Sequence, residues 1–299
     1  MQGSQTKSIR KVALTSLAGT SIEWYDFFLY GTAAAIIFPK AFFPADMPAM
    51  IALIASFSTF AVGFLARPLG GIVFGHFGDR VGRKKTLVTA LMIMGISTTL
   101  IGFLPTYDTI GYIAPLILVL LRFAQGLAIG GQWGGAMLLV TESAPPDKRG
   151  WYGAYAQAGA PIGVILANLA FLGVSGSMTE TAFLDWGWRI PFVASILLVC
   201  VSLYLQLNLE DTDAFKKLAA SQSAESNADK PTQRSPIIEV LSRHPGRVFL
   251  AAGAFLSIQV TFYILIAFIM AYGVNSPSVM LSRDTMLTAV LIGAMVMIP

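Results

Sequence analysis

The feature that most constrains this chain is a series of long apolar segments. A bilayer core of about 30 Å needs roughly 20 predominantly apolar residues in an α-helix. Segments of this kind lie near residues 12–38, 50–75, 86–104, 111–140, 151–173, 187–208 and 248–272, and another begins near residue 284. The chain is 55% hydrophobic and 12% charged, whereas soluble domains carry about 25% charged residues. The pattern predicts an all-α polytopic membrane protein with about eight spans, because the short alternating strands of a barrel are not seen.

Positive charge is distributed unevenly among the connecting segments. Fifteen of the 20 Lys and Arg residues lie in the N-terminal tail, in the loops after the second and fourth spans, and in the stretch 209–247. Lys40 and Arg283 lie in loops on the opposite side. Because cytoplasmic loops carry the excess of Lys and Arg, the N-terminus is predicted to be cytoplasmic. The hydrophilic start lacks the apolar core of a signal peptide, so we expect a multi-pass protein of the cytoplasmic (inner) membrane.

The stretch 209–247 differs from its surroundings, since it is rich in Ser, Ala, Lys and acidic residues. It is typical of a cytoplasmic linker. The linker is predicted to join a six-helix N-terminal bundle, residues 1–208, to the first two spans of a second bundle, residues 248–299. This layout is typical of transporters built from two six-helix halves. On that interpretation we expect the chain to be truncated and to lack about four further spans.

Two predicted cytoplasmic loops combine glycine with clustered charge. They are GHFGDRVGRKK, residues 75–85, and ESAPPDKRG, residues 142–150. Glycine permits close helix approach, and the charged side chains can form pairs that hold one arrangement of the helices and break in another. The alternative is a positively charged anchor with a static salt bridge. The residues predicted to form this cytoplasmic gate are Gly75, Asp79, Arg80, Gly82, Arg83, Lys84, Glu142 and Arg149.

The first of these loops resembles the signature loop between the second and third helices of the major facilitator superfamily, and the second resembles its companion motif after helix four. EWYDFFLYG, LRFAQGLAIGGQWGGA and WGWRIPF are similar to segments of the metabolite:proton symporter family, which includes shikimate, α-ketoglutarate, citrate and proline/betaine carriers. The resemblance covers most of residues 10–210. It implies an N-terminal fragment of a carrier that takes up a small organic acid or related metabolite with protons, by alternating access. The chain departs from the family in having Gln132 where a Glu is frequent, which leaves any carboxylate role at that position in doubt.

Four charged residues fall inside the predicted spans, namely Glu23, Asp26, Arg67 and Arg122. Each costs at least about 2.5–3.5 kcal/mol at mid-bilayer, so we expect them to face inward and to pair. From the helical rise, their depths from the cytoplasmic side are roughly 16, 21, 12 and 27 Å, in that order. Glu23 and Arg67 are therefore near one level, and Asp26 is about one turn from Arg122. Glu23, Asp26 and Tyr30 share one helical face.

The two carboxylates are candidates for proton coupling. Burial generally raises the pKa of a carboxyl group and a nearby guanidinium lowers it, so a change of surroundings can load and release a proton. We expect this role for Asp26 and Glu23, and the family resemblance implies it for Arg122. Arg67, next to Pro68, is expected to be structural or gating. The alternative is a static ion-pair network that fixes helix packing.

Substrate contacts are expected near the midplane of the first, fourth and fifth spans. Amides in membrane helices often bond a neighbouring helix instead, and aromatic rings often pack. The candidates are Tyr25, Tyr30, Gln125, Gln132, Trp133, Gln157 and Asn168. The cationic interior favours an organic acid over a sugar. Glycines at four-residue intervals, at 126, 130 and 134 and at 159 and 163, predict close helix packing.

Other classes of function fit the composition less well. Two histidines and one cysteine leave little material for a metal site or a disulfide framework, so we expect no metal, no cofactor other than the coupling proton, and no enzyme activity. The expected partners are a small molecule, the proton and the lipid bilayer, with no nucleic acid and a monomeric full-length protein. A proton-coupled antiporter of the same fold and an inactive fragment remain open alternatives, whereas a receptor or channel does not need the paired loop motifs.

Overall fold

The computed structural model describes residues 2–81, 83–207, 243–276 and 278–296, and some side chains within these ranges, including those of residues 78–85 and 131–139, fall outside the description. The long helices are α1 (Gln2–Ile36), α3 (Ala49–Val81), α4 (Arg83–Phe103), α6 (Ile113–Ser143), α7 (Arg149–Ser175), α9 (Arg189–Leu207), α12 (Pro245–Tyr263) and α14 (Arg283–Val296). Short helices α2 (Phe38–Ala41), α5 (Tyr107–Ile110) and α8 (Glu180–Ala182) lie in the connections. The prediction of an all-α chain is confirmed. Each predicted span coincides with one long helix, except the span near residues 248–272, which consists of α12, a π-helical turn and α13 (Ile269–Asn275).

The apolar character of the helices agrees with a membrane protein. Among the described residues, the helices long and apolar enough to cross a bilayer are Ala49–Gly75, Ile113–Gly130, Pro146–Ser175 and Pro245–Asn275. A fifth span is formed if Glu180–Gly187 and Arg189–Tyr204 are taken together, across a bend of 51°. Helix α4 contributes a shorter apolar stretch, Val88–Phe103. Large apolar side chains are exposed at intervals of three or four residues, as at Ile113, Leu116 and Leu120 of α6, which is expected of a helix face in contact with lipid.

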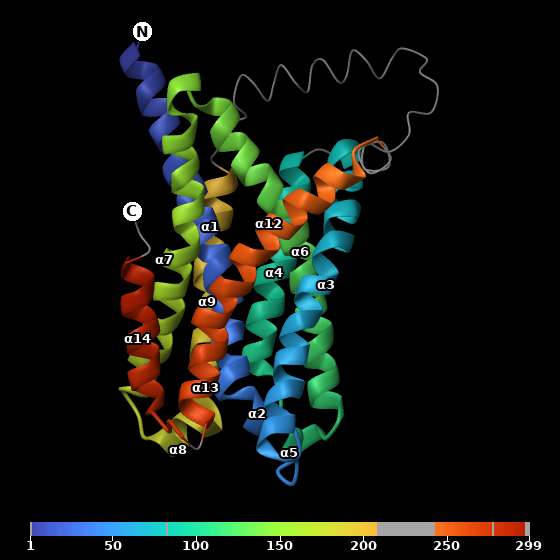
Figure 1. Ribbon diagram of the computed structural model, residues 1–299, viewed down its shortest axis with the longest axis vertical. Coiled ribbons are helices and arrows are strands. Elements are labelled where there is room, and N and C mark those ends of the chain that lie inside the picture. The colour runs from blue at the N-terminus through green and yellow to red at the C-terminus, as the bar shows by residue number, and fades with distance from the viewer. Residues whose placement is uncertain (1, 82, 208–242, 277, 297–299) are drawn as a thin grey trace. The chain divides into compact units, whose positions relative to one another are not determined.

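The chain divides into two compact units, one of residues 1–209 with 270–299 and one of residues 210–269. In the second unit, the described part is α12 followed by a π-helical turn, Ile264–Phe268. In the first unit, α14 packs against α7 and in this way forms one compact unit with the first six long helices (Figure 1). The boundaries predicted at residues 208 and 247 divide the chain into helix bundles, whereas the two compact units are divided by their internal contacts. The predicted boundaries therefore stay a prediction.

Small residues let the helices of the first unit approach closely. Helix α1 packs mainly on α7, and α3 packs on α6 (Figure 1). A Cβ atom added at Gly126 or Gly130 of α6 would collide with the backbone oxygens of Gly63 and Arg67 of α3. In the same way, a Cβ atom at Gly163 of α7 would lie 2.5 Å from the Cβ atom of Trp24. The predicted role of these glycines in close helix packing is confirmed, because membrane helices associate through such backbone proximity.

Proline and π-helical turns interrupt the regular helices. Pro68 and Pro161 lie inside α3 and α7. Pro191 lies in the first turn of α9, where a missing N–H removes no helical hydrogen bond. The 51° bend precedes it, after a π-helical turn at Phe183–Gly187.

Two buried clusters mark the ends of the first unit. One joins α1, α6 and α7 through Ile9, Ala13, Val140, Ala144 and Tyr152. The other is aromatic and consists of Phe38, Phe42, Phe171, Phe183, Trp188 and Phe192. Edge-to-face ring contacts of this kind add stability beyond the burial of apolar area. Glu23 and Asp26 of α1 lie between these two clusters along the helix.

Candidate functional site

Helix α1 carries both carboxylates of the candidate site on its buried face. The spacings of three and four residues place Glu23, Asp26 and Tyr30 on one side of the helix. Their exposed fractions are 8%, 1% and 0%. The three side chains therefore face the interior of the first unit and not its lipid-exposed surface.

Arg122 of α6 lies in a cage of aromatic rings. Its Cζ atom is 4.3 Å from the ring centre of Tyr30, 4.6 Å from that of Phe60 and 4.7 Å from that of Phe27. These distances are typical of cation–π contacts. Gly63 of α3 makes room for the cation, because a Cβ atom there would lie 2.6 Å from Arg122 Nε. These cation–π contacts partly replace the interactions with water that the guanidinium loses on burial.

A line of hydrogen bonds runs from Arg122 to helix α4. Arg122 Nη1 donates to Gln125 Oε1 at 3.1 Å, and Gln125 Nε2 donates to Thr98 Oγ1 at 2.7 Å. Thr98 in turn donates to the carbonyl oxygen of Met94 at 3.0 Å. Arg122, Gln125 and Thr98 are all buried. Both ends of the Gln125 amide are thus used inside the protein.

Asp26 lies beside Thr98, within reach of its hydroxyl group. Among the described residues, neither carboxylate oxygen of Asp26 has a hydrogen-bond partner of good geometry, although the side chain is 1% exposed. The nearest like charge that acts on Asp26 is Glu23. Buried polar groups in proteins are nearly always hydrogen-bonded, and ionisable residues inside membrane helices commonly have a functional role. Asp26 is therefore a candidate functional residue.

Arg67 of α3 is the charged neighbour of Glu23. Their proximity agrees with the levels predicted from the helical rise, and the ion pair between them stays a prediction. The Arg67 guanidinium lies over two rings, 4.7 Å from the centre of Phe27 and 4.6 Å from that of Phe64. Phe27 therefore contacts the guanidinium groups of both Arg67 and Arg122. Arg67 is half-buried.

The remaining predicted substrate contacts differ in their surroundings. The hydroxyl groups of Tyr25 and Tyr30 bond within the protein, Tyr25 to the carbonyl oxygen of Pro191 at 2.9 Å and Tyr30 to Thr59 at 2.7 Å. Asn168 is buried and donates to Val164, and among the described residues its side-chain oxygen has no hydrogen-bond partner. Gln157 is exposed. The side chains of Gln132 and Trp133 lie outside the described part of the chain.

Most of the predicted cytoplasmic gate lies outside the described residues. Gly82 is not described, and neither are the side chains of Asp79, Arg80, Arg83, Lys84 and Glu142. Gly75 and Arg149 are exposed. The proposed pairing in these loops therefore stays a prediction.

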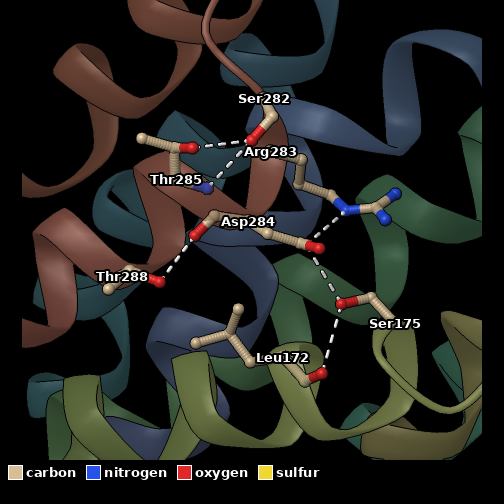
Figure 2. Close-up of polar contacts among 7 residues, drawn as sticks. All are labelled: Leu172, Ser175, Ser282, Arg283, Asp284, Thr285 and Thr288. Carbon is tan, nitrogen blue, oxygen red and sulfur yellow. Dashed lines mark hydrogen bonds and ion pairs between the residues drawn. The ribbon is translucent and has the colours of Figure 1, made fainter.

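A second polar contact joins α7 to α14 (Figure 2). Ser175 donates to Asp284 at 3.1 Å and also approaches the carbonyl oxygen of Leu172 at 3.2 Å. Arg283 Nε lies 3.5 Å from the Asp284 carboxylate, and its Cζ atom is 4.2 Å from the ring centre of Phe183. Ser282 accepts a hydrogen bond from the backbone N–H of Thr285 and so caps the start of α14 (Figure 2).

Nearby, Asn275 of α13 (Ile269–Asn275) donates to the carbonyl oxygen of Ala35 at 3.3 Å. The contact of α13 and α14 with α1 and α7 is therefore polar at two places.

Sequence reasoning missed three residues that shape the site, namely Thr98, Phe60 and Gly63. Thr98 and Phe60 stand in apolar helices without any charge nearby in the sequence, and only their long-range contacts reveal them. Gly63 had a signal, because Gly63, Ala66 and Gly70 are small residues on one face of α3. That pattern is the counterpart of the α6 glycines. Among the described residues, no group of three or more His, Cys, Asp or Glu side chains could hold a metal ion.

Long apolar helices packed through glycine, with buried charges on α1, α3 and α6, define a polytopic membrane protein of the major facilitator fold. The sequence model of the sugar (and other) transporter family matches residues 11–298, and the chain belongs to this family.

Curated relatives agree with this assignment. The chain is 46% identical over 297 residues to the inner membrane metabolite transport protein YhjE of Escherichia coli, with 98% of the chain and 66% of that protein covered. It is 46% identical to the shikimate transporter of Escherichia coli, with 89% of the chain and 59% of that protein covered. The proline/betaine transporter of Escherichia coli is 37% identical, over 88% of the chain and 53% of that protein. The chain thus spans between about half and two thirds of the length of these relatives, which are transporters and not enzymes.

Solved structures show the same fold. A proton:xylose symporter of the major facilitator superfamily matches with a TM-score of 0.72 at 17% identity, over 98% of this chain and 67% of that chain. A partially occluded, inward-open form of the xylose transporter of E. coli matches with a TM-score of 0.65, over 96% and 70%.

Proposed function

We propose that this chain supplies the proton-coupling half of a symporter that takes up a small organic acid or related metabolite across the cytoplasmic membrane. The observation that carries the proposal is the buried position of Asp26 next to Thr98, which is joined to Arg122 by hydrogen bonds through Gln125. Ionisable residues inside membrane helices commonly mark ion or substrate pathways. The names of the relatives support a metabolite as the substrate, and the arginines inside the helices, Arg67 and Arg122, support an acid.

In this mechanism Asp26 carries the proton and Arg122 provides the positive charge that the substrate meets. The Arg122 guanidinium lies among three rings, and its Nη1 donates to the neutral amide of Gln125. A buried guanidinium suits an incoming carboxylate, because hydrogen bonds between charged groups are stronger than those between neutral groups. Binding of the anion adds a negative charge to the site, and protonation of Asp26 removes one. Each step therefore makes the other more favourable.

Alternating access requires that the contacts at the two ends of the helices form in turn. The contact of Ser175 with Asp284 would close one end (Figure 2), and the charged loops at residues 75–85 and 142–150 would close the other. With the N-terminus in the cytoplasm, the Asp284 contact would be on the outer side. The described contacts then correspond to a state closed toward the outside.

The first test is Asp26→Asn, measured as uptake driven by an imposed pH gradient in proteoliposomes. Because asparagine cannot carry the proton, we expect pH-driven accumulation to be lost. Glu180→Gln is the matched control, since Glu180 is an exposed carboxylate of α8 and its loss should leave uptake unchanged. The assay uses the 299-residue chain in parallel with a chain extended to the length of its relatives. Accumulation by Asp26→Asn equal to that of the parent protein would remove Asp26 from the mechanism.

The substrate and the direction of flux need a separate experiment. A competition panel of shikimate, α-ketoglutarate, citrate, a benzoate-type acid, proline and betaine would identify the class of substrate. Symport predicts that an inward proton gradient raises uptake in right-side-out vesicles. An exporter or antiporter of the same fold would instead accumulate substrate in inverted vesicles.

A further inference from the structure

Thr98 and Gln125 stand between the candidate proton carrier and the candidate cation. They come from different helices, α4 and α6, and the Asp26 carboxylate comes from a third, α1. All donors in this line point the same way, from Arg122 to Gln125, from Gln125 to Thr98, and from Thr98 to the carbonyl oxygen of Met94. The end of the line at Thr98 is the point at which it reaches Asp26.

The Thr98 hydroxyl has one proton and two acceptors close by. In this structure the proton points to the Met94 carbonyl at 3.0 Å. A hydroxyl rotates freely to suit its surroundings, and a charged carboxylate accepts a stronger hydrogen bond than a neutral carbonyl does. When Asp26 is charged, the hydroxyl will turn to it, and when Asp26 is protonated, it will return to Met94. In this structure Gln125 donates to the Thr98 oxygen at 2.7 Å, and rotation of the hydroxyl proton leaves that oxygen able to accept this bond.

The Gln125 amide transmits the change to the cation. Its oxygen accepts from Arg122 Nη1 while its nitrogen donates to Thr98, so rotation of the amide would turn both ends to the wrong partner. Hydrogen bonds in such a line strengthen one another in a low-dielectric interior. A shift of Thr98 toward Asp26 therefore pulls on the amide and on the guanidinium together.

We propose that Thr98 and Gln125 are positioning residues that transmit the charge state of Asp26 to the orientation of Arg122. The inference rests on the proposed function, in which Asp26 carries the proton. It adds two uncharged residues, on α4 and α6, to the coupling mechanism. It also changes the role predicted for Gln125 from substrate contact to positioning.

Other ionisable groups near Asp26 have to be separated from this effect. They are Glu23, Tyr25 and Tyr30 on α1, Arg67 on α3 and Arg122 on α6. Helices α4, α7 and α9 carry charged residues only within their first turn, at residues 83–85, 149 and 189. Variants without a change of charge are therefore the suitable probes.

The first experiment is a double-mutant cycle on thermal stability, which needs no transport activity. Thr98→Val and Asp26→Asn are measured singly and together in detergent, at alkaline and at acidic pH. At alkaline pH, we expect Thr98→Val to lower the Tm by several degrees in the parent protein and by much less in the Asp26→Asn background. At acidic pH, where Asp26 is protonated, the difference between the two backgrounds should shrink.

The adjacent Thr99 gives a matched control. Its hydroxyl donates to the carbonyl oxygen of Gly95 at 2.8 Å, just as Thr98 donates to Met94, so Thr99→Val removes the same kind of backbone bond. We expect Thr99→Val to have the same effect with and without Asp26, and Thr98→Ser to restore the parent behaviour. An identical response of the Thr98 and Thr99 variants to Asp26→Asn would overturn the proposal.

The second experiment observes the cation directly. In proteoliposomes with isotope-labelled arginine, the Arg122 guanidinium resonance, assigned by its loss in Arg122→Lys, is recorded at acidic and alkaline pH. We expect a pH-dependent shift that is lost in Asp26→Asn and strongly reduced in Gln125→Leu and Thr98→Val. A full shift in Gln125→Leu would mean that Asp26 acts on Arg122 directly, and the positioning role would be wrong. Loss of transport with these spectra intact would instead count against the proposed function alone.

Discussion

At the scale of single residues, the space around Arg122 is set by the absence of a side chain at position 63. The guanidinium lies against three rings and one amide, and the backbone of α3 passes closely enough that a Cβ atom at residue 63 would be 2.6 Å from Nε and 3.2 Å from Cζ. A protein interior packs too densely to absorb such an overlap without movement. The cation can therefore hold its position only while residue 63 is glycine.

Gly63→Ala should consequently displace Arg122 and destabilise the protein. Overpacking of this kind costs about 1–3 kcal/mol, so we expect a lower Tm together with weaker proton-driven uptake. Gly173→Ala is the matched control, because it also changes a helical glycine and its Cβ atom would meet no atom within 4 Å. Equal Tm values for the two variants would show that Arg122 has more room than its contacts indicate.

At the scale of secondary-structure elements, the contact between α7 and α14 has the features of a reversible contact. Its polar part consists of single hydrogen bonds, and Asp284 is about half exposed. A partly exposed hydrogen bond contributes only about 0.5–1.5 kcal/mol. By contrast, α3 and α6 meet backbone to backbone at Gly126 and Gly130. We therefore expect α3 and α6 to move as one body and α14 to separate from α7.

Asp284→Ala should shift the protein toward a state in which α7 and α14 are apart. The distance can be measured by electron spin resonance between labels at Leu169→Cys and Ile292→Cys, both exposed on these helices, after Cys200→Ser removes the chain's one cysteine. We expect a larger population of long distances than in the parent protein. Thr288→Val is a suitable control, because Thr288 bonds only to the backbone of its own helix, at the Asp284 carbonyl. An unchanged distance distribution in Asp284→Ala would mean that apolar packing alone holds the helices.

At the scale of the whole molecule, the segments that the sequence predicts best are those with the strongest physical constraint. A helix that crosses lipid must be apolar along its whole length, and all eight predicted spans correspond to helices. The glycines at four-residue intervals also correctly predicted that α6 and α7 each pack closely on another helix, α6 on α3 and α7 on α1. The surroundings of Arg122 and of its partner Gln125 could not be predicted, because Phe60 and Gly63 beside Arg122 and Thr98 beside Gln125 are uncharged and lie 27 to 62 positions away in the sequence.

The predicted orientation can be tested by cysteine labelling in a Cys200→Ser background. Asp147→Cys and Asp46→Cys place thiols at exposed positions, in the short helical turn Pro146–Lys148 and in the segment between α2 and α3. An impermeant maleimide should label Asp46→Cys in right-side-out vesicles and Asp147→Cys only in inverted ones. The reverse labelling would place the N-terminus outside.

The ring of Phe27 has a consequence for how charge inside the protein can be altered. The phenyl ring of Phe27 contacts the guanidinium groups of Arg67 and Arg122, whose Cζ atoms each lie 4.7 Å from the ring centre. Phe27 belongs to helix α1, which also carries Glu23 and Asp26. Any rotation of α1 that withdraws this ring exposes two cations at once, on two other helices. Fluorination of Phe27, which drains electron density from the ring while preserving its shape, should therefore weaken both attachments together.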